Sequence, residues 1–189
     1  MDPNPIEQSD LKLLKELVRT ASLSRLKGIA NNENIQIAEI AESQKILGHW
    51  MSLILISGPK MRITFKVNFT ADVARSLALW IYQGKATDIL TEQAGDFIKE
   101  FCNLVGGKLK NTLSLNDVFM GLSLPLMTRS FDDIFFRTSP SLSTIRDRWK
   151  LQDGQANIYC AATIEIFERL NFPPVLKDDS NSGDVEFLT

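Results

Sequence analysis

Histidine and cysteine are scarce in this sequence, which limits the chemistry that its side chains can perform. The 189 residues include one histidine and two cysteines. His49 has no nearby cysteine or carboxylate cluster with the spacing of metal ligands, so we predict no metal site of the protein's own. Cys102 and Cys160 belong to no spaced metal or disulfide pattern, and both stand in apolar stretches. We therefore expect two reduced cysteines in the core.

The sequence also lacks a basic surplus and long hydrophobic runs. Lys and Arg number 21 against 23 Asp and Glu, which gives a net charge of -2. This balance argues against nucleic acid, or an anionic membrane surface, as the general partner. No apolar run reaches the roughly 18 residues that a membrane span needs, and the first residues do not match a signal peptide. We expect a soluble, cytoplasmic protein without membrane insertion.

The apolar content is sufficient for one core. Hydrophobic residues make up 44% of the chain, and the length is short for two ordinary domains. We predict a single domain over residues 1–175. Residues 176–189 lack periodicity and are polar, so we predict a flexible C-terminal tail there.

Three stretches have the 3.6-residue periodicity of amphipathic helices. They are residues 10–27, 71–83 and 88–115. Ser9 or Asp10 can cap the first of these helices. Gly28 is predicted to end the first helix, and Gly84 the second.

Apolar and alternating runs predict the strands of a sheet. They are residues 50–56, 62–69, 118–127, 131–136, 145–152 and 156–167, with a mixed signal at 35–47. In 62–69 the alternation turns Phe65 toward the core and Thr64 outward. Pro125 makes the 118–127 run an edge strand or a strand that ends in a loop. Asp153-Gly154 predicts a hairpin between the last two strands.

The helix predicted at 88–115 carries a polar stripe on its exposed arc. Its polar residues there are Asp96, Lys99, Glu100, Asn103 and Lys110. Two glycines, Gly106 and Gly107, interrupt the helix interior at a cost of about 1 kcal/mol each relative to alanine. Gly107 follows Asn103 by four residues, so both lie on one stripe. A missing side chain there lets another backbone approach the polar groups.

The stretch from Glu100 to Asn103, followed by Leu-Val-Gly-Gly-Lys, resembles the E-x-x-N signature of the CheC/CheX/FliY family of chemotaxis phosphatases, nearest CheX. A second match, Glu168 to Asn171, follows a predicted strand and meets two prolines. We interpret that second match as accidental, because it lacks the long amphipathic helix and the glycines.

The resemblance covers roughly residues 13–167 and implies an α/β fold. It implies an antiparallel sheet with two long helices packed side by side on one face, plus the N-terminal helix. The helix at 71–83 has no E-x-x-N pattern, so we expect one site per chain. The segment 122–128 lacks the paired prolines of CheX, and its path is left open.

The resemblance also implies a function in two-component signalling. Family members remove phosphate from the aspartate of a phosphorylated CheY-like receiver domain of a response regulator. By this reading Asn103 orients the attacking water, and Glu100 docks the lysine of the partner. The expected partner-binding surface comprises Asp96, Lys99, Gly106, Gly107 and Lys110. No cofactor of its own is expected, because the receiver supplies the divalent cation, Mg²⁺.

Other interpretations stay open at this point. A Glu and an Asn three residues apart are also common on ordinary solvated helix faces. The chain can be a catalytically silent receiver-binding or scaffold domain of the same fold. It can also be an unrelated small-molecule-binding module, which would need a deep apolar pocket with converging polar groups. The oligomeric state, including a homodimer, is not determined by the sequence.

Overall fold

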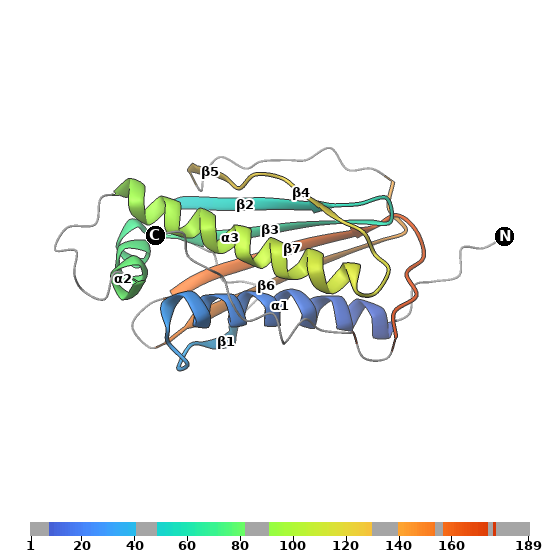
Figure 1. Cartoon of the computed structure of the whole chain (residues 1–189), viewed down its shortest axis with the longest axis horizontal. Helices are drawn as coiled ribbons and strands as arrows, with labels where there is room; N and C mark the ends of the chain where they lie inside the picture. The colour runs from blue at the N-terminus through green and yellow to red at the C-terminus, as the bar shows by residue number, and fades with distance from the viewer. Residues whose placement is uncertain are drawn as a thin grey trace.

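An antiparallel sheet forms one layer of the protein, and helices lie across one of its faces (Figure 1). The computed structural model describes residues 8–40, 49–81, 91–129, 140–153, 157–173 and 176. The segment predicted as a strand at 131–136 and nearly all of the predicted tail at 176–189 lie outside the described residues. The predicted α/β class with an antiparallel sheet is confirmed.

The middle of the sheet consists of two antiparallel strand pairs, and the second of them is the hairpin that Asp153-Gly154 predicts. Its strands are β1 (Gln36–Glu39), β2 (Trp50–Ser57), β3 (Met61–Phe69), β4 (Gly121–Leu122), β5 (Leu126–Arg129), β6 (Ser143–Gln152) and β7 (Asn157–Ile166). The order is β1-β6-β7-β3-β2-β4, with β5 also paired to β2, and every pair is antiparallel. The edge position predicted for 118–127 is therefore confirmed, as two short strands on either side of Pro125.

The core lies between the sheet and the helices, because alternate strand residues point to the same face. Phe65 on β3 and Trp149 on β6 are both 0% exposed, with ring centroids 6.1 Å apart. Thr64 points to the opposite face, as predicted, yet only 4% of its surface is exposed. The mixed signal at 35–47 gives the short strand β1, and residues 41–48 lie outside the described part.

Three helices are described, and two of them are long. They are α1 (Gln8–Ala30), α2 (Ala71–Ile81) and α3 (Thr91–Ser114). Figure 1 shows α1 running alongside α3 across the sheet, whereas α2 lies at one end of it. The N-terminal helix therefore takes the place beside α3. None of the described helices combines the length and the apolar character needed to cross a bilayer.

Helix α1 ends later than predicted. Gly28 lies inside the helix, on its exposed side, where a missing side chain costs little packing. The chain turns instead at Asn31, whose φ of 46° is in the left-handed region. The Asn32 N–H then donates to the Lys27 carbonyl at 3.1 Å and closes the last turn. Gly84, predicted to end the second helix, and residues 88–90, predicted to begin the site helix, lie outside the described residues.

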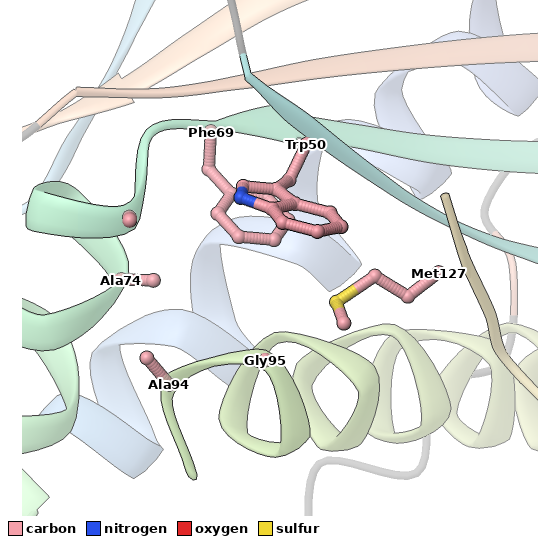
Figure 2. Close-up of a pocket in the computed structure, with 7 residues that line it drawn as sticks. Trp50, Phe69, Ala74, Ala94, Gly95 and Met127 are labelled. Carbon is pink, nitrogen blue, oxygen red and sulfur yellow. The ribbon is translucent and has the colours of Figure 1, made fainter. Parts of the chain in front are cut away.

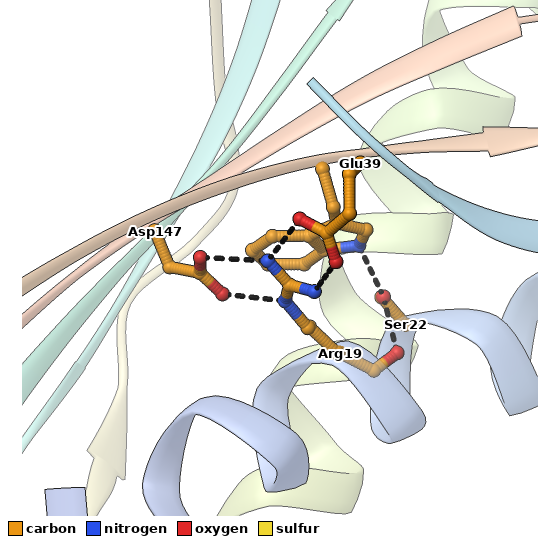
Figure 3. A network of polar contacts seen from close by, with 5 residues as sticks. Arg19, Ser22, Glu39 and Asp147 are labelled. Carbon is orange, nitrogen blue, oxygen red and sulfur yellow. Dashed lines mark hydrogen bonds and ion pairs between the residues drawn. The ribbon is translucent and has the colours of Figure 1, made fainter. Parts of the chain in front are cut away.

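Arg19 fixes α1 to the sheet through two carboxylates (Figure 3). Its guanidinium binds Asp147 of β6 with both arms, Nε to Oδ2 at 2.6 Å and Nη2 to Oδ1 at 2.8 Å. It also pairs with Glu39 of β1. These hydrogen bonds, first to Asp147 and then to Glu39, raise the pKa of Arg19 and keep it charged. The hydrogen bond from Arg19 lowers the pKa of Glu39.

An aromatic ring also packs against the Arg19 guanidinium. The Arg19 guanidinium lies 5.7 Å from the centre of the Trp149 ring, a cation–π distance. Trp149 Nε1 in turn donates to the Ser22 hydroxyl at 3.1 Å, which satisfies the buried indole N–H. Arg19 and Ser22, one helical turn apart on α1, therefore both contact β6.

Arg19→Met should lower the free energy of unfolding by about 2 kcal/mol, because it leaves the Asp147 carboxylate without its counter-charge. The side chain of Asp147 is only 8% exposed. Glu39→Gln should cost much less, because that carboxylate is 74% exposed and screened by water. Urea denaturation of both variants measures the difference. Equal losses would show that Asp147 is not the partner that matters.

Candidate functional site on helix α3

The apolar face of α3 is buried against the sheet and α1. Ile98, Phe101, Val105 and Leu109 are all 0% exposed. The Phe101 ring meets Phe65 of β3 edge-on, with centroids 6.1 Å apart. The amphipathic helix predicted from the sequence is confirmed, and its register along the sheet is fixed by this packing.

The polar stripe faces outward as predicted. Glu100 and Asn103 are both exposed, one helical turn apart. Asn103 Nδ2 lies 3.5 Å from Glu100 Oε2, at the long limit of a hydrogen bond. So long a contact is weak, and it leaves both groups able to bind a partner. The helix therefore presents a carboxylate and an amide side by side.

Charged residues extend the stripe in both directions. Lys99 Nζ pairs with Asp96 Oδ1 at 2.6 Å, three residues apart on the helix. Lys110 is exposed two turns beyond Asn103. Exposed pairs of this kind contribute little stability, so these charges are available to an incoming surface.

The two central glycines have different surroundings. A Cβ at Gly107 would meet nothing within 4 Å, so the space above this part of the stripe is open. Gly106, which we predicted on the partner-binding surface, is buried instead. Its Cβ would lie 3.0 Å from Ile54 Cδ1 and 3.3 Å from Leu122 Cδ2. The glycine at 106 allows α3 to approach the sheet, and the prediction of an exposed position was wrong.

A third glycine, Gly95, repeats this close approach and was missed at the sequence level. Its Cβ would lie 2.9 Å from Met127 Cε on β5. Gly95 and Gly106 are eleven residues apart, which is about three helical turns, so both face the same direction. That spacing was the available signal. The two glycines bring α3 against the β4–β5 edge of the sheet.

A small apolar pocket opens near the start of α3 (Figure 2). Its volume is about 120 Å³, and its lining consists of Trp50, Phe69, Ala71, Ala74, Ala94, Gly95 and Met127. Neither Glu100 nor Asn103 belongs to the lining, and no lining side chain is charged. A small-molecule module would bring its polar groups together in such a pocket. The candidate residues lie instead on an exposed helix face.

None of the other reactive side chains considered in the sequence lies on the polar stripe of α3. Burial raises the pKa of the Cys102 thiol to about 12, and it also raises the pKa of Cys160. His49 is exposed at the start of β2. Glu168 and Asn171 follow β7 outside any helix, as expected for an accidental match. Within the described ranges, no three His, Cys, Asp or Glu side chains gather as metal ligands would.

Comparison with solved structures finds the same fold in several chemotaxis proteins. CheX from Vibrio vulnificus matches with a TM-score of 0.62 and 16% identity, over 79% of this chain and 97% of that one. A CheC-like protein from Shewanella sp. PV-4 matches with a TM-score of 0.63 and 18% identity, over 79% and 96%. The chain has a CheX-like fold. At the sequence level, neither a protein-family model nor a curated protein matches it.

A further match comes from a complex. CheX of Borrelia burgdorferi, crystallised with CheY, BeF₃ and Mg²⁺, matches with a TM-score of 0.60 and 14% identity, over 81% of this chain and 97% of that one. The resemblance inferred from the E-x-x-N pattern is thereby confirmed for the fold. In this CheX-like fold the pattern lies mid-way along a long helix with an outward polar face.

Substitution by leucine should affect stability differently at the two central glycines. Gly106→Leu should lower the free energy of unfolding by about 2 kcal/mol, because the side chain is forced against Ile54 and Leu122. Gly107→Leu should leave stability unchanged or raise it by up to about 1 kcal/mol, through better helix propensity. Thermal and urea unfolding of both proteins measure this. A destabilised Gly107→Leu would contradict the open space above that residue.

Proposed function

We propose that this chain is a phosphatase that acts on the aspartyl phosphate of a CheY-like receiver domain. The observation that carries the proposal is the exposed pair on α3, with Asn103 and Glu100 one turn apart on a helix whose opposite face is buried. The CheX-like fold supports it, and CheX of Borrelia burgdorferi binds CheY in the matched complex.

Few catalytic groups are needed for this reaction. The partner brings a reactive acyl phosphate and the divalent cation bound beside it, so hydrolysis requires mainly that a water molecule be aligned for in-line attack. The Asn103 amide can both accept from and donate to that water. An amide has no useful pKa in this range, so its role is orientation and it abstracts no proton.

Glu100 has a different role in the proposed complex. Receiver domains hold a lysine beside their phosphoryl group, and the Glu100 carboxylate can bind that ammonium across the interface. Its contact with Asn103 is long, at 3.5 Å, so little is lost when the lysine replaces it. The ion pair would align the phosphoryl group with Asn103.

The helix supports this role by holding both side chains on a rigid frame. Residues placed on packed helices keep their geometry better than residues on loops. The open space above Gly107 gives a partner room to approach the same stripe. A catalytically silent receiver-binding domain would need the surface but not the Asn103 amide, so the presence of the amide beside Glu100 favours catalysis.

The two residues should fail in different ways when replaced. Asn103→Ala should lower the dephosphorylation rate by about 10²-fold with binding little changed, because only the water loses its positioning group. Glu100→Ala should weaken binding as well as the rate, because the lysine of the partner loses its counter-charge. The measurement is the rate against protein concentration, with affinity for a beryllofluoride-loaded receiver determined separately.

A double variant provides the control for this pair. Glu168→Ala with Asn171→Ala removes the second E-x-x-N match, and it should alter neither quantity, because both residues are exposed outside any helix. Full activity in Asn103→Ala would rule out the proposed role of the amide.

Gly107→Leu should prevent the receiver from binding although the fold is preserved. The new side chain would project from the polar stripe one turn after Asn103, where the partner is expected to approach. The expected result is loss of both binding and dephosphorylation, measured alongside the stability of the variant. Normal activity in the leucine variant would show that no close approach occurs at Gly107.

A further inference from the structure

The edge of the sheet beside α3 contains a β-bulge. Leu122 pairs with Ile56, and Leu126 pairs with Leu53. The edge chain therefore advances by four residues where β2 advances by three. Ser123 continues the hydrogen-bond ladder with β2, because its N–H donates to the Leu55 carbonyl at 2.9 Å. Two residues, Leu124 and Pro125, are then left opposite Ile54, and one of them is the extra residue of the bulge.

The bulge carries a large apolar side chain that is open to solvent. Leu124 is 88% exposed, the largest value among the exposed large hydrophobic residues of the described part. Leu122, on the helix side of the same edge, is 37% exposed. The surrounding segment, residues 118–128, contains no charged residue. The edge therefore offers an uncharged, apolar surface centred on Leu124.

Leu124 lies level with the candidate site along α3. Leu122 lies close to Gly106, and Met127 lies close to Gly95, so the edge runs antiparallel to the helix. Eleven helical residues rise about 16 Å, and five strand residues cover about the same length. The midpoint of this stretch of edge therefore faces the turn of α3 that carries Glu100 and Asn103.

The apolar edge and the polar stripe of α3 are also neighbours when their directions around the helix axis are compared. Gly95 and Gly106 mark the side of α3 that faces the edge strands. At about 100° per residue, Asn103 lies about 80° from Gly95 around the axis, on the neighbouring exposed side. A protein seated on Asn103 would therefore also cover the apolar edge next to it.

We infer that Leu124, with Leu122 beside it, is a docking contact for an apolar side chain of the receiver partner, next to the partner's phosphorylated site. The inference rests on the proposed function and adds a second, uncharged part to its interface. The continuity of this edge with the polar stripe favours a receiver over a second copy of this chain.

The chain offers a matched control for this contact. Leu126 lies on the same edge and is 49% exposed, but it pairs with Leu53, whose side chain points to the sheet face away from α3. Leu124→Asn and Leu126→Asn therefore remove the same side chain from two positions of one edge, and the Leu126 position lies on the face away from α3. Urea unfolding of both proteins verifies that neither change disrupts the sheet.

The test measures affinity for the receiver domains of the same genome, loaded with beryllofluoride and Mg²⁺, together with kcat and KM for the phosphorylated forms. Leu124→Asn should weaken binding and raise KM by about tenfold, with kcat unchanged, because the side chain packs at the interface and touches no reacting atom. Leu126→Asn should bind and react like the unmodified protein.

The remaining outcomes overturn the inference in distinguishable ways. Unchanged affinity in Leu124→Asn shows that the edge is not contacted, and equal losses in the two variants show a general effect of edge polarity. A change of oligomeric state in Leu124→Asn with normal receiver binding assigns the edge to a second copy of this chain. If the unmodified chain neither binds nor dephosphorylates any receiver, the proposed function fails, and the docking contact fails with it.

Discussion

The close packing of α3 against β2 and the β4–β5 edge is the constraint on which the rest of the structure depends. It requires small residues where the helix meets the sheet, and Gly95 and Gly106 provide them. The buried row from Ile98 to Leu109 then fixes the rotation of the helix. Because that rotation is fixed, the side chains on the opposite side have defined positions, and Glu100 and Asn103 face outward together.

Helix α1 supports the position of α3 on the side away from the β4–β5 edge. Helix α1 lies beside α3, and the ion pairs of Arg19 with Asp147 and Glu39 hold α1 to β6 and β1. Trp149 lies under the guanidinium and packs against Phe65, which itself meets Phe101 of α3. A continuous series of contacts thus joins the Arg19 ion pairs on α1 to the core beneath α3.

The sequence predicted what depends on local patterns, including α3, the hairpin of the last two strands and the outward direction of Glu100 and Asn103. It could not distinguish Gly106 from Gly107, because adjacent positions on a helix differ by about 100° and the side that meets β4 depends on tertiary packing. The end of α1 was also wrong, since Gly28 suited a helix end but Asn31 adopts the left-handed conformation. The ion pair of Arg19 with Asp147 joins residues 128 positions apart, so it has no local signal. The bulge at Leu124 depends on the register of the edge chain against β2, which has no local signal either.

The decay of phosphorylated receiver domains from the same genome tests the central claim most directly. Each receiver is phosphorylated on its aspartate with a small phosphodonor, the donor is removed, and the loss of phosphate is followed with and without this chain. The account predicts that at least one receiver loses its phosphate about 10²-fold faster, in proportion to the concentration of the chain. Unchanged decay of every receiver, at concentrations where the chain demonstrably binds one of them, would contradict catalysis and leave α3 as a binding surface only.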